Sequence, residues 1–212
     1  WARSPVPFRI PTVCGQQKSL FWIKRNNTES PSTTWGVILR IALEVLFFRS
    51  LFRNDRAELD GTQRVIYRTN LLLWLGGLTF HWSLLIILVR HLKLFFEPAP
   101  GFVTFLHNLD GLFQISAPTL LATDILVVVT LGYLVFRRAL NPQVRYVSLF
   151  SDYFPLILIL GIVMSGILMR HFYRADLLEI KRFILGMLSL NPAIPKDVGI
   201  VFYVHLFLAS IL

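Results

Sequence analysis

Two histidines lie ten residues apart in the stretch FHWSLLIILVRH at positions 80–91, which is otherwise almost entirely apolar. A buried imidazole needs a partner for each ring nitrogen, because an unsatisfied polar group in apolar surroundings costs free energy. The neighbouring side chains offer few such partners. We therefore expect His81 and His91 to bind a group that the polypeptide itself does not supply.

The spacing of these histidines suits a planar ligand that contains iron. On a helix, ten residues rise about 15 Å and turn the second side chain about 80° from the first. His81 would then lie deep in a membrane, and His91 would lie nearer to its outer surface. Haem iron accepts one imidazole on each face of its ring. Two haems could thus bind at two depths, each with a second histidine from another helix.

A third histidine lies at the depth that the outer haem requires. His205, in VFYVHLF, is the only other histidine well inside an apolar run. If the spans alternate in direction, the helix that begins near residue 198 runs from outside to inside, and His205 matches His91 in depth. We predict that these two residues hold the outer haem. The inner haem would be held by His81 and a ligand beyond Leu212.

Polar residues around His91 indicate how a quinol could react beside the outer haem. A quinol that is oxidised there must lose two protons, and His107 and Asp110, in FLHNLDG, are the nearest candidate acceptors. Arg90 and Lys93 could pair with haem propionates or with a quinone carbonyl. For these two cations, snorkelling to lipid headgroups is an equally good interpretation.

Simpler interpretations stay open for each polar residue taken alone. A lone membrane histidine often makes one interhelical hydrogen bond or lines a cavity. His171, which follows Arg170, is expected to be an interfacial residue at a helix end. Asp124 lies in another apolar run and is either a hydrogen-bonded structural group or part of a proton path. The combined pattern of three histidines favours haem over these alternatives.

The composition is that of a membrane protein. Of the 212 residues, 55% are hydrophobic and 16% are charged, and the mean hydropathy is +0.61. A soluble domain carries about 25% charged residues. The net charge of +9 is spread over the gaps between apolar runs, which is typical of loops at a membrane surface rather than of a nucleic-acid site. The single cysteine, Cys14, excludes an internal disulfide, covalent c-type haem and a self-contained iron–sulfur site.

Apolar runs predict an all-α membrane protein with interfacial helices in the gaps. A spanning helix needs roughly 20 mostly apolar residues. Four stretches qualify or nearly do: about 70–96, 118–138, 153–173 and the run from 198 to the chain end. The last is cut short, and the chain starts with Trp1 rather than Met, so we expect the natural protein to extend beyond both ends.

Two regions are predicted on this basis. Residues 1–68 form a basic cytoplasmic or interfacial segment with an amphipathic helix at about 34–53, for which a spanning helix is the alternative. Residues 69–212 form the haem-binding transmembrane bundle. The first region holds eleven of the 21 basic residues and the gap at 97–117 holds none, so the positive-inside rule places the first in the cytoplasm and the gap outside.

The histidine pattern resembles the nitrate-reductase-gamma-like family of dihaem cytochrome b subunits. The resemblance rests on FH-x9-H on one helix and on a later histidine-bearing helix, over about 80–212. In that family the first helix supplies two haem ligands and the last helix supplies two more, eighteen residues apart. The resemblance implies that His81, His91 and His205 are haem ligands and that a fourth ligand would fall near position 223.

The leader adds a second resemblance. Over about 4–54, SPVPFRIPTVCGQQKSLFWIKRNN and LEVLFFRSLFRN resemble membrane cytochrome b subunits of the complex associated with dissimilatory sulfite reductase. This branch implies a bundle of about five transmembrane helices in a prokaryotic cell membrane, of which this chain shows three complete and one partial. It also implies two b haems that exchange electrons between menaquinol or menaquinone and a cytoplasmic iron–sulfur partner similar to heterodisulfide reductase, beside other membrane and periplasmic subunits. The basic segment 1–68 would dock that partner.

Two other classes of function remain as alternatives. A transporter or channel subunit would use Asp124 and the histidines as proton sites, and it would have no visible chromophore. A membrane anchor would only hold a peripheral complex on the membrane, and it would tolerate leucine at every membrane histidine. The pair of His81 and His91 with a depth-matched His205 argues against both.

Overall fold

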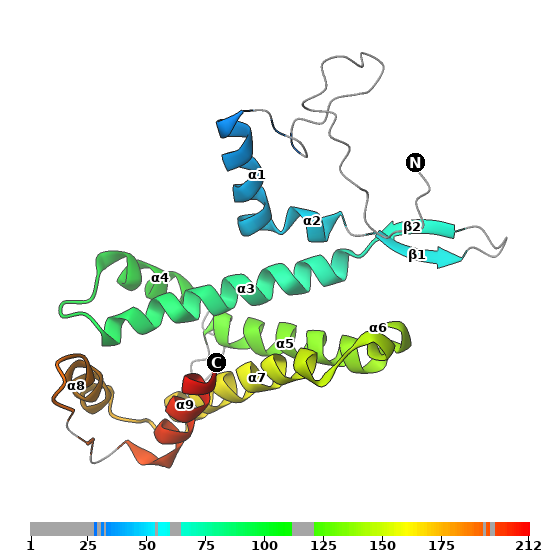
Figure 1. Cartoon of the computed structure of the whole chain (residues 1–212). Coiled ribbons are helices and arrows are strands. Elements are labelled where there is room, and N and C mark those ends of the chain that lie inside the picture. Colours follow the sequence, from blue (N-terminus) through cyan, green and yellow to red (C-terminus); the bar gives the residue numbers. More distant parts are fainter. Residues whose placement is uncertain are drawn as a thin grey trace. The chain divides into compact units, whose positions relative to one another are not determined.

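The computed structural model describes residues 28, 31, 33–53, 55–59, 65–111, 121–192, 194–195 and 198–212. The chain divides into two compact units, Trp1–Leu78 and Thr79–Leu212, which are described separately. Most of the leader that carries the second resemblance, including Cys14, lies outside the described residues. Figure 1 labels the helices and strands.

The first unit contains a helix that is interrupted where one continuous helix was predicted. Helix α1 spans Thr34–Phe47, and α2 spans Arg49–Phe52. Between them Phe48 has a φ of 47°, which is the left-handed conformation that ends a helix. The Glu44 carboxylate then accepts hydrogen bonds from the Ser50 N–H (2.9 Å) and hydroxyl (2.6 Å), so it stabilises the first turn after the break.

A two-stranded hairpin follows, and the sequence analysis did not predict it. Strands β1 (Asp55–Leu59) and β2 (Val65–Thr69) pair antiparallel, with Asp55 opposite Thr69 and Leu59 opposite Val65. The run Val65-Ile66-Tyr67 consists of β-branched and aromatic residues, which favour strands. The prediction of an all-helical chain is therefore corrected in this stretch, while the rest of the described secondary structure is helical.

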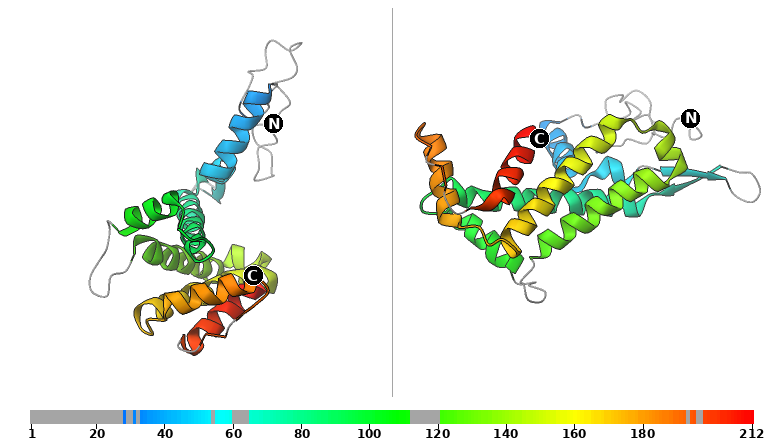
Figure 2. Two further views of the ribbon diagram at one scale, coloured as in Figure 1. Left: turned by 90° about the vertical axis from the view of Figure 1, so that its left-hand side faces the viewer. Right: turned by 90° about the horizontal axis from the view of Figure 1, so that it is seen from below.

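The second unit is a helical bundle. It begins within α3 and contains the helices α3 (Leu71–His91), η1 (Leu92–Leu94), α4 (Gly101–Gly111), α5 (Ala122–Leu140), α6 (Pro142–Val147), α7 (Phe150–His171), α8 (Leu177–Leu188) and α9 (Gly199–Ile211). Helices α5 and α7 lie side by side, and α9 lies against α7 (Figures 1 and 2). Gly161 and Gly166 of α7 approach Leu208 and His205 of α9, respectively, so these two helices are antiparallel.

The bundle is held together by a small apolar core. Phe80 of α3, Val127 and Leu131 of α5 and Val163 of α7 are buried against one another. A second cluster joins Ile180 of α8 to Phe202 of α9. The bundle core therefore contains only a few side chains, and much of the apolar surface faces outward.

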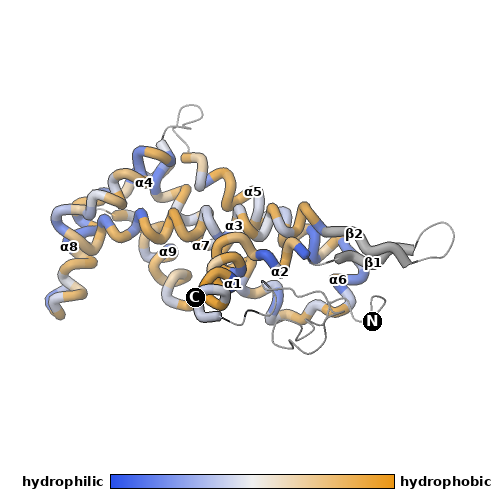
Figure 3. Tube along the Cα trace, turned by 90° about the horizontal axis from the view of Figure 1, so that it is seen from above, coloured by the Kyte–Doolittle hydropathy of each residue, from blue (hydrophilic) through white to orange (hydrophobic). Residues whose placement is uncertain are grey.

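Two of the predicted spans are long and apolar enough to cross a membrane. They are Leu71–Leu94 and Phe150–His171, and within the most apolar part of each only 22% and 17% of the residues are buried in the structure. A core helix of a soluble protein would be mostly buried, so these exposed apolar faces favour a lipid environment. Figure 3 shows the apolar residues along α3 and α7. Helix α9 is apolar but shorter.

The third predicted span, about 118–138, is a helix but does not meet the same criterion. Helix α5 carries Asp124 in its first turn and Arg137 and Arg138 in its last turn. Charged residues at both ends shorten its apolar length. The helix predicted in this region is therefore confirmed, but its length and composition do not by themselves identify it as a transmembrane span.

Candidate functional site

The structure brings two of the three predicted haem ligands together. His91 is the last residue of α3, and His205 lies in the middle of α9. The centres of their rings are 6.4 Å apart, and the ring planes are inclined by only 9°. The two residues are separated by more than a hundred positions in the chain, so this near-parallel arrangement is a product of the tertiary fold.

The hydrogen bonds of His205 fix which ring nitrogen carries its proton. Nδ1 lies 3.0 Å from the Ile162 carbonyl and 2.9 Å from the Ser165 hydroxyl oxygen, both on α7. The Ser165 hydroxyl itself donates to the Ile162 carbonyl (2.9 Å). Since a carbonyl can only accept and this hydroxyl proton is already used, Nδ1 must be the donor. Nε2 of His205 therefore carries the free lone pair.

The same reasoning applies to His91. Its Nδ1 lies 2.7 Å from the Ile87 carbonyl one helical turn earlier, so Nδ1 donates and Nε2 keeps its lone pair. Neither Nε2 takes part in a hydrogen bond within the described part of the chain. A ring whose Nδ1–H is bound to a backbone carbonyl and whose Nε2 is free is the usual form of a metal-binding histidine.

The spacing of the two rings fits one metal ion between them. Metal–imidazole bonds are about 2 Å long, so an ion bound to both Nε2 atoms would hold the ring centres roughly 6 Å apart. Among the described residues no group of three or more His, Cys, Asp or Glu side chains could hold a metal ion. Two protein ligands are sufficient for iron only when a macrocycle supplies the others, as haem does.

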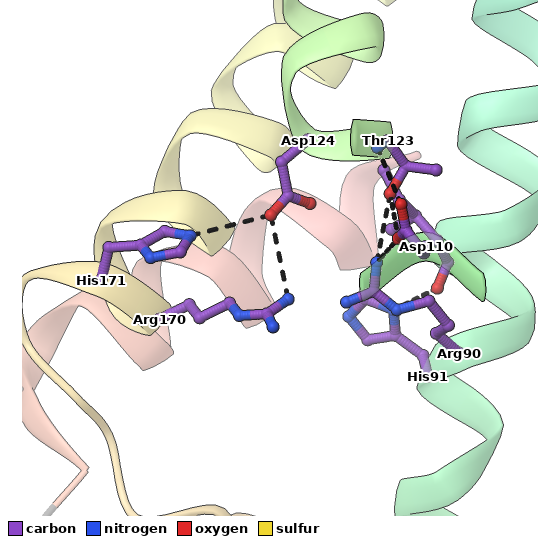
Figure 4. A network of polar contacts seen from close by, with 8 residues as sticks. Arg90, His91, Asp110, Thr123, Asp124, Arg170 and His171 are labelled. Carbon is purple, nitrogen blue, oxygen red and sulfur yellow. Dashed lines mark hydrogen bonds and ion pairs between the residues drawn. The ribbon is translucent and has the colours of Figure 1, made fainter. Parts of the chain in front are cut away.

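A buried polar cluster lies directly beside His91 (Figure 4). Arg90 Nη1 donates to Asp110 Oδ2 of α4 at 2.5 Å and to the Thr123 hydroxyl of α5 at 3.1 Å. Asp110 also accepts from the Thr123 N–H (3.0 Å) and hydroxyl (2.6 Å). We name Arg90, Asp110 and Thr123 the arginine cluster. It joins α3, α4 and the start of α5, and it uses both carboxylate oxygens of Asp110.

A second polar cluster starts at the next residue of α5. Oδ2 of Asp124 lies 3.8 Å from Arg170 Nη1 and 3.7 Å from His171 Nε2, and both of these residues belong to the end of α7 (Figure 4). We name Asp124, Arg170 and His171 the aspartate cluster. It places His171 against a buried carboxylate, whereas the sequence favoured an interfacial position.

The remaining predicted site residues occupy the same end of the bundle. His107 on α4 is half-buried, and burial lowers its pKa from the ordinary value, helped by the positive charges of Arg90, Lys93 and Arg170 and opposed by Asp110. Lys93 in η1 is also half-buried. His107 is therefore neutral near pH 7, and its lowered pKa makes it a weaker proton acceptor than an ordinary imidazole.

His81 lies apart from these residues. It precedes His91 by ten residues on α3, which corresponds to about 15 Å along the helix axis. Its side chain is exposed, and its ring is edge-on to that of Phe80 at 4.9 Å. The two predicted ligands of α3 therefore lie about 15 Å apart along the helix axis.

Sequence reasoning missed the role of Ser165 and the pairing of Arg90 with Asp110. Ser165 has no special neighbour in the sequence, and its contact with His205 exists only because α9 returns along α7. The approach of Arg90 to Asp110 depends on the turn of the chain between η1 and α4. The clearest sign in the sequence that α9 approaches α7 closely is the glycine at 166, because a Cβ atom there would lie 3.2 Å from Cε1 of His205.

Comparison with known proteins places these residues in a family. The family model described as nitrate reductase gamma subunit matches residues 32–212. That range includes α1, the bundle and all five histidines. The chain belongs to the nitrate reductase gamma subunit family. Together with the two apolar helices, membership of this family identifies the chain as a membrane protein and implies haem b.

Two members of curated sequence collections are closely similar. One from Archaeoglobus fulgidus, named Hdr-like menaquinol oxidoreductase cytochrome b-like subunit, is 40% identical over 219 residues, covering 100% of this chain and 65% of that protein. One of the same name from Archaeoglobus profundus is 39% identical over 201 residues, covering 92% of this chain and 59% of that protein. The chain thus spans about three fifths of these relatives' length. No solved structure matches it.

Proposed function

We propose that this member of the gamma subunit family is a membrane cytochrome b subunit that exchanges electrons between menaquinol or menaquinone and a partner protein through b haems. The observation that carries the proposal is the pair of His91 and His205. Their rings are 6.4 Å apart and nearly parallel. Both Nδ1 atoms are engaged by the protein, and both Nε2 atoms are left to bind iron.

The haem between these residues would be the outer one. His91 and His205 would hold its iron, which when bound supplies a one-electron carrier in the membrane. His81 would bind the inner haem together with a residue after Leu212. Arg90 and Lys93 remain candidates for contacts with propionates or a quinone carbonyl, although Arg90 Nη1 is already engaged by Asp110 and Thr123.

Quinol would be oxidised at the outer end of the bundle. His107 and Asp110 are the acceptors that the sequence proposes for its protons, and both lie on α4 at this end. Asp110 has both carboxylate oxygens engaged by the arginine cluster, so its contribution is to hold Arg90. His107 keeps Nδ1 buried and without a hydrogen-bond partner in the described structure, which leaves it available as an acceptor.

The partner would be a cytoplasmic iron–sulfur subunit similar to heterodisulfide reductase, docked on the basic segment 1–68. The names of the two relatives, which describe their menaquinol oxidoreductase as Hdr-like, support this proposal. The resemblance of the leader adds a role in a respiratory complex linked to sulfite reduction, with other membrane and periplasmic subunits, in the prokaryotic cell membrane. The bundle would cross that membrane several times.

The test is a pyridine haemochrome spectrum of the full-length subunit purified with its complex, scaled to protein. We expect two b haems per chain, and we expect menaquinol to reduce at least one of them. One haem per chain would keep the His91–His205 site and make His81 a structural residue. Absence of haem would overturn the proposal and favour a transporter or an anchor.

The close packing of α7 and α9 makes Gly166 a sensitive position. In Gly166→Ala the added Cβ would lie 3.2 Å from Cε1 and 3.6 Å from Nδ1 of His205, so the ring must shift by a few tenths of an ångström. We expect a changed electron paramagnetic resonance signal of one ferric low-spin haem and a lower occupancy of that haem.

Gly161→Ala is the matched control for this prediction. Gly161 is on the same helix and faces the same partner helix, but its added Cβ would meet only the end of the Leu208 side chain at 3.4 Å. We expect its spectrum to equal that of the wild type. Equal spectra for both variants would show that His205 does not bind iron in the position described.

A further inference from the structure

Four buried polar atoms near the His91–His205 pair have no hydrogen-bond partner. Within the described residues they are Nε of Arg90, Nδ1 of His107, Oδ2 of Asp124 and Nε2 of His171. Each comes from a different helix, and all four residues lie at the end of the bundle where α3 and α7 finish and α5 begins. Native proteins leave few such atoms unsatisfied, and a group of them indicates a missing polar ligand.

Two of these atoms face each other directly. Oδ2 of Asp124 and Nε2 of His171 are 3.7 Å apart, which is too long for a hydrogen bond. Their side chains are 12% and 5% exposed, so bulk water does not replace the missing bonds. Arg170 lies 3.8 Å from the same oxygen. Oδ2 of Asp124 is therefore a buried carboxylate oxygen that receives no hydrogen bond, although His171 and Arg170 lie 3.7 and 3.8 Å away.

Asp110 makes the contrast clear. It lies at the same end of the bundle, but it accepts hydrogen bonds from Arg90 and from two groups of Thr123 at 2.5–3.0 Å. Its lone pairs are used inside the protein. Asp124 is the carboxylate of this region whose oxygen is left open to a ligand.

The aspartate cluster is also close to the proposed haem ligands. Gly166, where an added Cβ would meet the His205 ring, precedes His171 by five residues on α7, or about 7.5 Å along the helix axis and about 140° around it. On the other side, Arg90 adjoins His91 in the chain and interacts electrostatically with both Asp124 and Arg170. A molecule bound at Asp124 would thus lie at the same end of the bundle as His91.

We propose that Asp124 and His171, in place of His107 and Asp110, are the proton-accepting pair for the quinol that is oxidised beside the His91–His205 pair. This inference rests on the proposed function. It assigns Asp124 to proton transfer, whereas the sequence left open whether Asp124 is a structural group or part of a proton path. A quinol hydroxyl is a neutral hydrogen-bond donor, which the open oxygen of Asp124 can accept. His171 then receives the proton when its Nε2, now 3.7 Å from that oxygen, moves to hydrogen-bond distance.

The proton and electron balance is complete with the haem as oxidant. Oxidation of one quinol to a quinone breaks two O–H bonds and releases two protons and two electrons. For each half, the hydroxyl proton moves to Asp124 Oδ2 and on to His171 Nε2, and His171 passes it to water at the membrane surface. A haem held by His91 and His205 would supply the one-electron oxidant for each half, and the partner would take the electron from it before the second half.

Charges from the surrounding helices favour this direction. Arg90 and Lys93 come from the end of α3 and from η1, and Arg170 comes from α7. His107 and Asp110 come from α4, and Asp110 already neutralises Arg90. The positive charge of Arg170, which lies 3.8 Å from Asp124, stabilises the oxygen anion that a quinol leaves when its proton departs.

The experiment uses the full-length subunit in its complex, with Asp124→Asn. Asparagine keeps the size and can still accept a hydrogen bond, but it cannot take up a proton. We expect the rate of haem reduction by menaquinol to fall at least 100-fold, the size typical of a lost general base. Haem content and the dithionite-reduced spectrum should be unchanged. Binding of a hydroxyquinoline N-oxide, measured by fluorescence quenching, should weaken about tenfold.

Asp152→Asn is the matched control. Asp152 also forms an ion pair between α5 and α7, with Arg138 at 3.4 Å, but at the opposite end of both helices. It should change neither the rate nor the binding of the probe. His171→Gln is a second test, and it should slow haem reduction to a similar degree while the Asp124–Arg170 pair is retained.

The outcomes separate this inference from the proposed function. A rate within threefold of the wild type in Asp124→Asn, or a rate loss that only parallels loss of haem in both variants, would overturn the proton-accepting role. Wild-type protein that carries no haem, or haem that menaquinol does not reduce, would instead overturn the proposed function itself.

Discussion

Replacement of His205 by alanine in the full-length subunit is expected to remove one of two b haems per chain. His205 and His91 are the two side chains that the structure holds with nearly parallel rings and free Nε2 atoms. Loss of either axial ligand leaves haem iron with one protein bond, so His91→Ala should remove the same haem. The measurement is the ratio of haem to protein together with the redox titration of the haem that remains.

Two further variants sharpen this test. His81→Ala should remove the other haem, so its remaining haem should have a different midpoint potential from that left in His205→Ala. Ser165→Ala removes the hydrogen bond of 2.9 Å to Nδ1 of His205 and the bond that the serine hydroxyl donates to the Ile162 carbonyl. That carbonyl still accepts from Nδ1 of His205. The variant should keep both haems. If His91→Ala and His205→Ala leave different haems, the two residues do not share one iron.

Breaking the arginine cluster is expected to produce the largest loss of stability in the bundle. The side chains of Arg90 and Asp110 are 10% and 3% exposed, and they form a hydrogen-bonded ion pair. Removing one partner of a buried pair leaves an uncompensated charge and costs about 3–5 kcal/mol. Asp110→Ala should therefore lower the melting temperature of the detergent-solubilised protein by roughly 10 °C.

The control for this prediction removes both charges. In the double variant Arg90→Met, Asp110→Leu no buried charge is left alone, and most of the stability should return. Arg182→Ala gives the opposite reference. It breaks the pair with Glu179 on the surface of α8, where Arg182 is 73% exposed, and it should cost less than about 1 kcal/mol. A melting temperature of Asp110→Ala equal to that of Arg182→Ala would contradict the structural role.

Much of the bundle could be predicted from the sequence because its signal is local. Apolar runs gave the helices at Leu71–Leu94 and Phe150–His171 within a few residues. Interfacial helices were predicted in the gaps between the apolar runs, and in the gap between the third and fourth runs the structure has α8 at Leu177–Leu188. These features follow from the composition of about twenty neighbouring residues.

The features that could not be predicted depend on contacts across the chain or on a single backbone conformation. The break at Phe48 requires a positive φ at a bulky residue, and Glu44 supports it from within the same segment. The β1–β2 hairpin has two short strands of five residues each, within the basic segment for which only an amphipathic helix was predicted. From the sequence, Asp124 could not be distinguished from a carboxylate whose hydrogen bonds are all made within the protein. The difference arises because Arg90 and Thr123 donate their hydrogen bonds to Asp110 and not to Asp124.

The positions of Thr123 and Asp124 have a consequence for how α5 is set in the bundle. These consecutive residues belong to different clusters, one bound to α3 and α4 and the other to the end of α7. The valines of α5 at 127–129 point in directions about 100° apart, with Val127 buried and Val129 62% exposed, so a turn of the helix could exchange one valine for another in the core. Two polar anchors about 100° apart remove that freedom. The rotational register of α5 is thus defined in its first turn, where Thr123 faces Arg90 and Asp110 while Asp124 faces Arg170 and His171.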